Sequence, residues 1–440
     1  MNERTNEDNQ LNRRDFLINT ALAGGALSLV PGSRLWGATD PDYDGPLFIM
    51  VDANGGWDAT SFCDPKTNVP GELVINHWAE NDEARMAGNI PYAPFSGNQK
   101  FFEKYYRHML VINGIDSQTN AHSVGVIHNW SGRLSVGYPA MPALLSAIYA
   151  PDMPIAWINN GGYPESANLI RFTRLEDPNL IQSVLYPTRV PWDGAPWIRD
   201  NEWAAMRASQ QARLDSLRTK DDLLPWQKNH RDIYYDAREN AAGLEAFANL
   251  IPPADQLEPA EINGRWAPMR RQSQLALLAF KAGVAMTADV AHFEFDTHDD
   301  HDNRQAVALE TVTDAVDYLW ETAEALGLAD RLTVLMCSDF GRTPHYNDDN
   351  GKDHWPIGSA IIMQKNAPWA NRVVGQTDEG HNALSINPQT LQVDEANGTI
   401  IYPRHVLTAF RALAGIDMNP ITQRFQFFDN AEFDFFNPSL

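Results

Sequence analysis

Short, unbroken apolar runs recur along this chain and alternate with longer segments of helical spacing, a pattern that strongly limits the possible folds. Two of the helical segments cover 272–286 and 307–326, and an apolar run follows each of them. Strands that are apolar on both faces are buried on both faces, as in parallel sheets between layers of helices. The apolar runs lie at 46–51, 109–113, 154–158, 290–295 and 332–336. We therefore predict an α/β fold with a central, mostly parallel sheet covered by helices on both faces.

A polar stretch between about 187 and 268 interrupts this alternation. It is rich in Ala, Arg, Glu and Gln with helical spacing, and it ends in a connection punctuated by proline. It predicts a helical insertion in a domain that covers 39–440.

The first segment, 1–38, has the pattern of an export signal. Arg13 and Arg14 precede an apolar run, rich in Ala and Gly, that covers 16–30. This order is typical of a twin-arginine signal, and the run is short and weakly apolar for a spanning helix of about 20 residues. We expect passage through the twin-arginine translocase to the periplasm, without stable membrane insertion. The alternative is a core helix with an accidental arginine pair.

Charge and cysteine content exclude several classes of protein. Lys and Arg number 34 against 57 Asp and Glu, so the net charge is −23, and no basic block offers a face to nucleic acid. The two cysteines, Cys63 and Cys337, exclude a disulfide scaffold and a cysteine-rich zinc module. Since twin-arginine cargo folds in the reducing cytosol, we expect two buried free thiols.

Polar loops with carboxylates and histidines follow the apolar runs. In open parallel sheets, sites form at the carboxyl ends of the strands, so these loops are expected to meet. One of them, Asp296-Thr-His-Asp-Asp-His301, taken alone would be an ordinary solvated acidic loop. Several such loops at strand ends instead favour a metal centre, because imidazole and carboxylate ligate zinc and, with more carboxylate, manganese or calcium.

Ser123 stands at the expected start of a helix and has two readings. A hydroxyl at that place is usually an N-cap. A helix N-terminus also attracts anions, and a neighbouring metal would lower the pKa of the hydroxyl and make it a nucleophile.

The loop motifs, in their order, resemble the alkaline phosphatase superfamily of metal-dependent phosphatases and sulfatases. More narrowly, the chain resembles the exported bacterial family catalogued as domain of unknown function 1501. The motifs are Gly55-Gly-Trp-Asp58, His122-Ser123 with Trp130-Ser-Gly132, Asp296-Thr-His298, Ser338-Asp-Phe-Gly-Arg-Thr-Pro344 and Asp353-His354-Trp. The resemblance implies an alkaline-phosphatase-like sheet and one or two divalent metal ions, with zinc favoured over manganese or calcium.

The resemblance also implies roles for individual residues. Ser123 stands at the position of the nucleophile, and Asp58, rather than Asp52, at that of the first-strand carboxylate. The full set of implied metal ligands is Asp58, Asp296, His298, His301, Asp339 and His354. Phe340 and His122 depart from the superfamily pattern, and they leave a second metal site short of ligands. Cys63-Asp-Pro65-Lys-Thr67 has Thr where a formylglycine sulfatase needs Arg.

We therefore expect a periplasmic metal-dependent hydrolase of phosphate or sulfate esters, acting on a small-molecule or polysaccharide ester. Arg133, Arg342 and His122 are the candidates for binding its anionic group, since guanidinium forks onto tetrahedral anions. The alternative is a non-catalytic exported protein that keeps the fold and binds a metal or another ligand.

Overall fold

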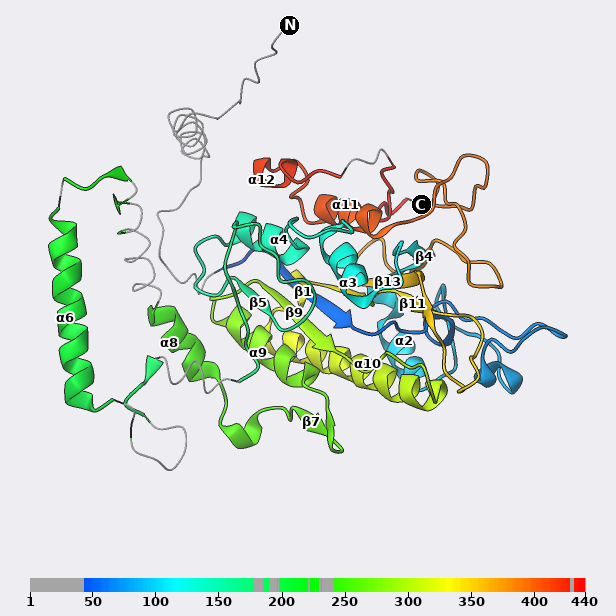
Figure 1. Ribbon diagram of the computed structural model, residues 1–440, viewed down its shortest axis with the longest axis horizontal. Helices are drawn as coiled ribbons and strands as arrows, with labels where there is room; N and C mark the ends of the chain where they lie inside the picture. The colour runs from blue at the N-terminus through cyan, green and yellow to red at the C-terminus, as the bar shows by residue number, and fades with distance from the viewer. Residues whose placement is uncertain are drawn as a thin grey trace, which may run out of the picture. The chain divides into compact units, whose positions relative to one another are not determined.

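A mixed sheet with strand order β14-β4-β13-β10-β1-β9-β5-β6 forms the centre of the described part of the protein (Figure 1). Its strands are β1 (Leu47–Ala53), β4 (Met109–Asp116), β5 (Trp157–Asn159), β6 (Phe172–Thr173), β9 (Thr287–His292), β10 (Leu332–Cys337), β13 (Ile357–Gln364) and β14 (Arg372–Val374). Within this sheet, only β13 pairs antiparallel, with β10 and with β4, and the other pairings are parallel. The mostly parallel sheet is therefore confirmed.

The structure, a computed structural model, describes residues 43–177, 185–189, 196, 198–220, 222–225, 227–228, 231, 241–427 and 431–439. The described residues belong to one compact unit of the chain, 38–440. The expected signal segment lies outside them. In the described ranges, no helix combines the length and the apolar character needed to span a bilayer.

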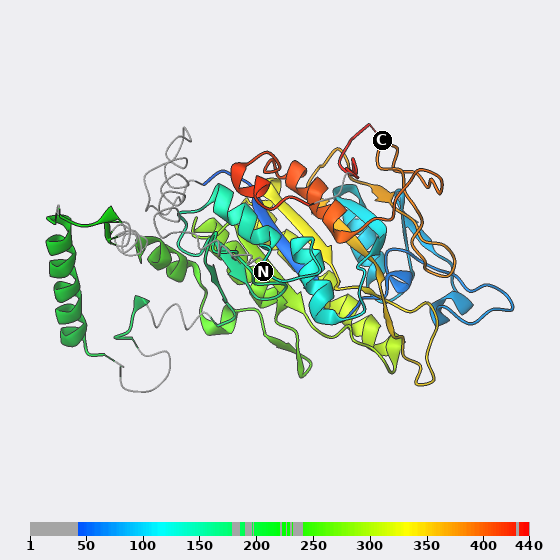
Figure 2. The same ribbon diagram turned by 45° about the horizontal axis from the view of Figure 1, so that its top comes forward.

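Helices cover both faces of the sheet, as expected from its apolar strands. Figures 1 and 2 show α3, α4 and α11 over one face and α2, α9 and α10 over the other. They are α2 (Asn98–Tyr105), α3 (His122–Ser131), α4 (Met141–Tyr149), α9 (Met269–Lys281), α10 (His301–Leu326) and α11 (Pro403–Leu413). All residues of β1, β9 and β10 are consequently buried, and they form the middle of the core.

The remaining elements lie in connections. Within 187–268, where we expected a helical insertion, the described residues include α6 (Asp200–Arg218), α8 (Ala241–Leu250) and the hairpin of β7 (Glu261–Ile262) and β8 (Arg265–Trp266). Elsewhere lie α12 (Pro420–Gln423) and the strand pairs β2 (Arg85–Ala87) with β3 (Ile90–Tyr92) and β11 (Gly341–Arg342) with β12 (His354–Trp355). Short 3-10 helices cover Ala59–Ser61, His77–Glu80, Tyr106–His108, Ala254–Gln256 and Ala329–Arg331.

Parallel pairing brings the loops after β1, β9 and β10 to the same edge of the sheet. Asp52 of β1 pairs in register with Cys337 on one side and with Ala291 on the other. The loops then pack backbone against backbone at two glycines. A Cβ on Gly55 would lie 2.5 Å from the amide nitrogen of Asp296, and one on Gly351 would lie 1.7 Å from the carbonyl oxygen of His298. Only glycine permits this approach.

Candidate metal centre

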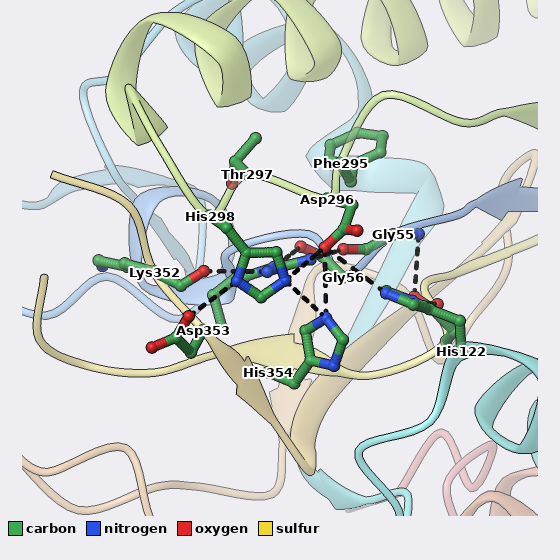
Figure 3. A network of polar contacts seen from close by, with 12 residues as sticks. Gly55, Gly56, His122, Phe295, Asp296, Thr297, His298, Lys352, Asp353 and His354 are labelled. Carbon is green, nitrogen blue, oxygen red and sulfur yellow. Dashed lines mark hydrogen bonds and ion pairs between the residues drawn. The ribbon is translucent and has the colours of Figure 1, made fainter. Parts of the chain in front are cut away.

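Three imidazole rings converge on one carboxylate at this edge of the sheet (Figure 3). The Nε2 atoms of His298, His354 and His122 lie 3.0, 3.2 and 3.5 Å from Oδ1 of Asp296. The Nε2 atoms of His298 and His354 are also only 3.0 Å apart. In His122, Asp296 and His354, one potential ligand atom of each residue lies within 4.8 Å of those of the other two.

The second ring nitrogen of each histidine faces an acceptor. The pairs are His122 Nδ1 with Asp339 Oδ2 (2.5 Å), His298 Nδ1 with Asp353 Oδ1 (2.7 Å) and His354 Nδ1 with the carbonyl oxygen of Asn120 (2.8 Å). Because each Nδ1 faces an acceptor, the hydrogen-bond network assigns the hydrogen of a neutral ring to Nδ1. The lone pair then lies on Nε2. Metal-binding histidines are oriented in this way. Three lone pairs and a carboxylate that face one another repel unless a cation lies between them, so these residues fit a metal ion.

The charges of the carboxylates agree with this fit. Although burial raises the pKa of Asp296, Arg342 and the neighbouring histidines hold it at about 2, so the carboxylate is ionised. The hydrogen bond that His122 Nδ1 donates to Asp339 raises the pKa of His122 above its usual value, against the effect of burial. In the absence of a metal, a proton on His122 would therefore relieve part of the repulsion.

Asp339 reaches the centre through His122. Its side chain is fully buried, and Oδ1 accepts hydrogen bonds from the backbone N–H of Gly55 (3.1 Å) and from the Ser338 hydroxyl (3.0 Å). Oδ2 is thereby aimed at His122 Nδ1. Asp353, which we had not singled out as a site residue, plays the same part for His298: its Oδ1 faces His298 Nδ1.

Asp58 and His301 lie in a separate buried cluster. His301 Nε2 lies 3.0 Å from Asp58 Oδ2, and the Lys352 ammonium donates to the same oxygen at 2.7 Å, with all three side chains 0% exposed. Burial alone would raise the pKa of Asp58, but Lys352 and His301 hold it well below the usual value. Of the six expected ligands, the structure thus places Asp296, His298 and His354 around one point, together with His122, which we had expected to bind substrate.

The two expected anion-binding arginines have other contacts. The guanidinium of Arg342 is fully buried and donates to the carbonyl oxygens of Gly55, Gly56 and Lys352 and, at 2.6 Å, to Asp296 Oδ1. It therefore ties three loops together and holds the central carboxylate. Arg133 donates to the Tyr138 hydroxyl and the Gln426 carbonyl oxygen, and it stacks over the Tyr138 ring.

A pocket of about 570 Å³ adjoins the centre and shares His122 with it. Ser123 lines this pocket with an exposed side chain. The N-cap of α3 is Ala121, which excludes the N-cap role for Ser123, and within the described residues its hydroxyl has no hydrogen-bond partner. The hydroxyl is thus available to a ligand.

Arg174 and Asp52 also line the pocket. Arg174 is exposed and forms no ion pair with any described residue. We had missed it because it follows the edge strand β6, which has only two residues and no clear sequence signal. Asp52 is buried and accepts a hydrogen bond from the backbone N–H of Gly162 at 2.9 Å. Burial raises the pKa of Asp52 to about 8.

The family model described as "Protein of unknown function (DUF1501)" matches residues 237–415. This match agrees with the resemblance inferred from the loop motifs and includes Asp296, His298 and His354. Among curated proteins, none matches the chain.

Several solved structures are similar to the chain at low sequence identity. Alkaline phosphatase from the Antarctic bacterium TAB5 is 8% identical, with a TM-score of 0.32 over 75% of this chain and 95% of that one. The PsFucS1 sulfatase from Pseudoalteromonas sp. is 12% identical, with a TM-score of 0.32 over 76% and 66%. The lipoteichoic acid synthase LtaP from Listeria monocytogenes is 10% identical, with a TM-score of 0.35 over 95% and 81%. Similarity at this level does not assign a function to the chain.

Proposed function

We propose that this chain, which resembles the DUF1501 family, is a periplasmic metal-dependent hydrolase of phosphate or sulfate esters. The observation that carries the proposal is the orientation of three histidines. Each has its Nδ1 on an acceptor and turns its Nε2 toward the ionised Asp296. A set of three imidazoles and one carboxylate suits zinc better than calcium, which prefers oxygen ligands.

The residues divide into ligands, supports and reacting groups. His122, His298, His354 and Asp296 would hold the metal, and Arg342 fixes Asp296. A bound divalent metal would draw negative charge from the ester oxygens and lower the pKa of a neighbouring hydroxyl.

Ser123 is the nucleophile in this proposal. It follows the proposed ligand His122 in α3, and its hydroxyl, which has no hydrogen-bond partner among the described residues, lines the adjoining pocket. Its oxygen forms a bond to phosphorus or sulfur while the bond to the alcohol oxygen breaks, and the alcohol leaves with a proton. Water then hydrolyses the ester on Ser123 and restores the hydroxyl.

The pocket supplies the remaining binding groups. Its volume of about 570 Å³ is within the range for small organic ligands, so it has room for the alcohol part of an ester or for the end of a sugar chain. The guanidinium of Arg174, which forms no ion pair with any described residue, is available for the anionic oxygens.

Metal analysis and turnover of two variants test this function. The protein is purified without chelator, its metal content is measured, and aryl phosphates and aryl sulfates are screened. We expect His354→Ala to lose most of its metal and its activity, because one of the ligands is removed. We expect Ser123→Ala to retain the metal and to lose nearly all turnover, because only the attacking oxygen is gone.

The outcomes separate the hydrolase from its alternative. If Ser123→Ala keeps the wild-type rate per bound metal, Ser123 is not the nucleophile. Bound metal without turnover on any ester would favour an exported binding protein. Protein without metal would refute both the centre and the reaction.

A further inference from the structure

A second set of ligand-type side chains surrounds the ammonium of Lys352. Its Nζ donates to Asp58 Oδ2 at 2.7 Å, to Asn76 Oδ1 at 3.1 Å and to Thr60 Oγ1 at 3.3 Å. His301 Nε2 lies 3.0 Å from the same Asp58 oxygen. All five residues are at most 1% exposed, so no bulk water reaches this cluster.

The chemistry of this cluster is that of a divalent cation site. A carboxylate, an amide oxygen, a hydroxyl and an imidazole are all groups that ligate divalent metals. The ammonium, however, already satisfies them, because its three N–H donors match the three oxygens. The other Asp58 oxygen accepts from the backbone N–H and the hydroxyl of Thr60, at 2.9 and 2.7 Å.

The two clusters differ in what they leave unsatisfied. His122 Nε2, at the metal centre, is a buried nitrogen that makes no hydrogen bond within the described residues, although Asp296 Oδ1 lies 3.5 Å away. The described atoms that surround Lys352 include no such orphan: Asp58, Thr60, Asn76, His301 and Lys352 all have partners. The first cluster therefore keeps an unsatisfied ligand nitrogen beside Asp296, whereas in the second cluster the ammonium of Lys352 already satisfies the ligand-type oxygens.

We propose that Lys352 permanently fills a second cation position, so that the protein binds a single divalent metal and gains a second metal site only when this ammonium is removed. The inference rests on the proposed function for the first metal alone. It gives a physical reason for a mononuclear centre: a divalent ion cannot share the Asp58 oxygen with an ammonium at 2.7 Å without strong repulsion.

Lys352 also positions the first centre. Its backbone N–H donates to the carbonyl oxygen of Thr297 at 3.1 Å, and its own carbonyl oxygen accepts from Arg342 at 2.9 Å. The next two residues along the chain are Asp353 and His354, which belong to the metal centre. The buried ammonium thus anchors the segment that carries them.

Metal stoichiometry tests the proposal without any need for turnover. Wild-type protein, dialysed against excess Zn²⁺ or Mn²⁺ and washed, should retain one metal per chain. Lys352→Ala should retain two, because Asp58, Asn76, Thr60 and His301 are then free to ligate. The same ion should raise the melting temperature of Lys352→Ala more than that of the wild type, since it replaces the lost charge.

Control variants fix the interpretation. Lys66→Ala removes a neighbouring lysine that is paired with Asp64, and it should keep one metal. Asp58→Asn combined with Lys352→Ala should return the count to one. Two tightly bound metals in the wild type, or no gain in a folded Lys352→Ala or Lys352→Met protein, would overturn the inference. If neither variant folds, the wild-type count alone decides.

A failure of the proposed hydrolase would look different. Protein that binds one metal but turns over no ester loses the hydrolase and keeps the role of Lys352. A wild type without metal and a Lys352→Ala protein with one would support the second position and reject the first centre.

Discussion

At the scale of single residues, each histidine of the centre uses its two ring nitrogens for different purposes. Nδ1 donates a hydrogen bond to an acceptor, and Nε2 is left to bind a metal ion. The acceptor matters because an imidazole that can rotate presents its lone pair only part of the time, which lowers the affinity for a metal. Asp339 is the most strongly fixed of these acceptors, since its other oxygen is bound to the Gly55 backbone.

Asp339→Ala tests the acceptor behind His122. Removing it frees the ring of His122 and lowers its basicity, so the dissociation constant for Zn²⁺ should rise about 10- to 100-fold. Competition with a chromophoric chelator measures this constant. Asp348→Ala, which removes an exposed carboxylate, is the matched control and should leave it unchanged. Equal zinc affinities in wild type and Asp339→Ala would show that Asp339 does not support the centre.

The residue types of the site could be read from the sequence, but their division into two clusters could not. Asp296, His298 and His354 lie in loops that follow apolar runs, and the expectation that sites form at the carboxyl ends of strands located them. The grouping depends on contacts between distant positions, such as His122 with Asp339, which are 217 residues apart. Lys352 had no sequence signal at all, because a lone lysine in an acidic loop normally lies in solvent.

At the scale of elements, one ion network clamps α2 onto α10 on the face of the sheet away from α3. Asp317 of α10 accepts a hydrogen bond from the Tyr105 hydroxyl at 2.6 Å and pairs with Lys100 at 2.9 Å and with Lys104. Burial raises the pKa of Asp317, but these donors outweigh it and lower the pKa from 3.8 to about 2.

Asp317→Asn should destabilise the protein at neutral pH by about 1–2 kcal/mol, because the buried acceptor of Lys100, Lys104 and Tyr105 loses its negative charge. A carboxylate with a lowered folded pKa stabilises the fold above its unfolded pKa and loses that effect as the pH falls toward 2. The difference from wild type should therefore shrink between pH 4 and pH 2, as urea unfolding can show. Glu321→Gln, at an exposed partner of Lys104, is the control. A gap that stays constant with pH would contradict the charged clamp.

The elements that the sequence predicted are the long, apolar ones. Runs at 46–51 and 332–336 correspond to β1 and β10, and the helical segments correspond to α9 and α10, shifted by a few residues. We missed β13, although it is apolar, because we read the connection after β10 as one continuous loop. That connection contains no helix, and β13 after it runs antiparallel to β10. A pattern of alternating strands and helices predicts parallel neighbours, so it does not predict this strand.

At the scale of the whole molecule, the proposed periplasmic location depends on the expected twin-arginine signal. Lys in place of Arg13 and Arg14 keeps the charge but removes the planar, forked guanidinium groups. Arg and Lys are not interchangeable where a receptor recognises the guanidinium group. We expect the double variant to accumulate in the cytoplasm, with its fold and metal content unchanged. Cell fractionation measures this, with Arg4→Lys as the control. Undiminished periplasmic protein in the double variant would rule out the twin-arginine route.

The state of the two cysteines is compatible with the proposed folding before export. Cys63 and Cys337 are both free and buried, which confirms the expected thiols. Burial raises the pKa of Cys63 to about 12, so it is not a reactive thiolate at neutral pH. Nothing in the described fold therefore needs an oxidising compartment to form.

The four groups of the candidate metal centre come from positions 122, 296, 298 and 354, and Gly55, in the loop after β1, supports them through Asp339. During synthesis, the chain emerges from the ribosome in order, so the last of these ligands becomes available only after about four-fifths of the protein has been made. A nascent chain can therefore hold no complete centre, and the metal must be captured near the end of translation or after it. If the chain is exported folded, as we propose, the order of events is translation, closure of the sheet edge, capture of the ion, and only afterwards passage across the membrane, and the cytoplasmic supply of metal would then decide which ion the protein carries.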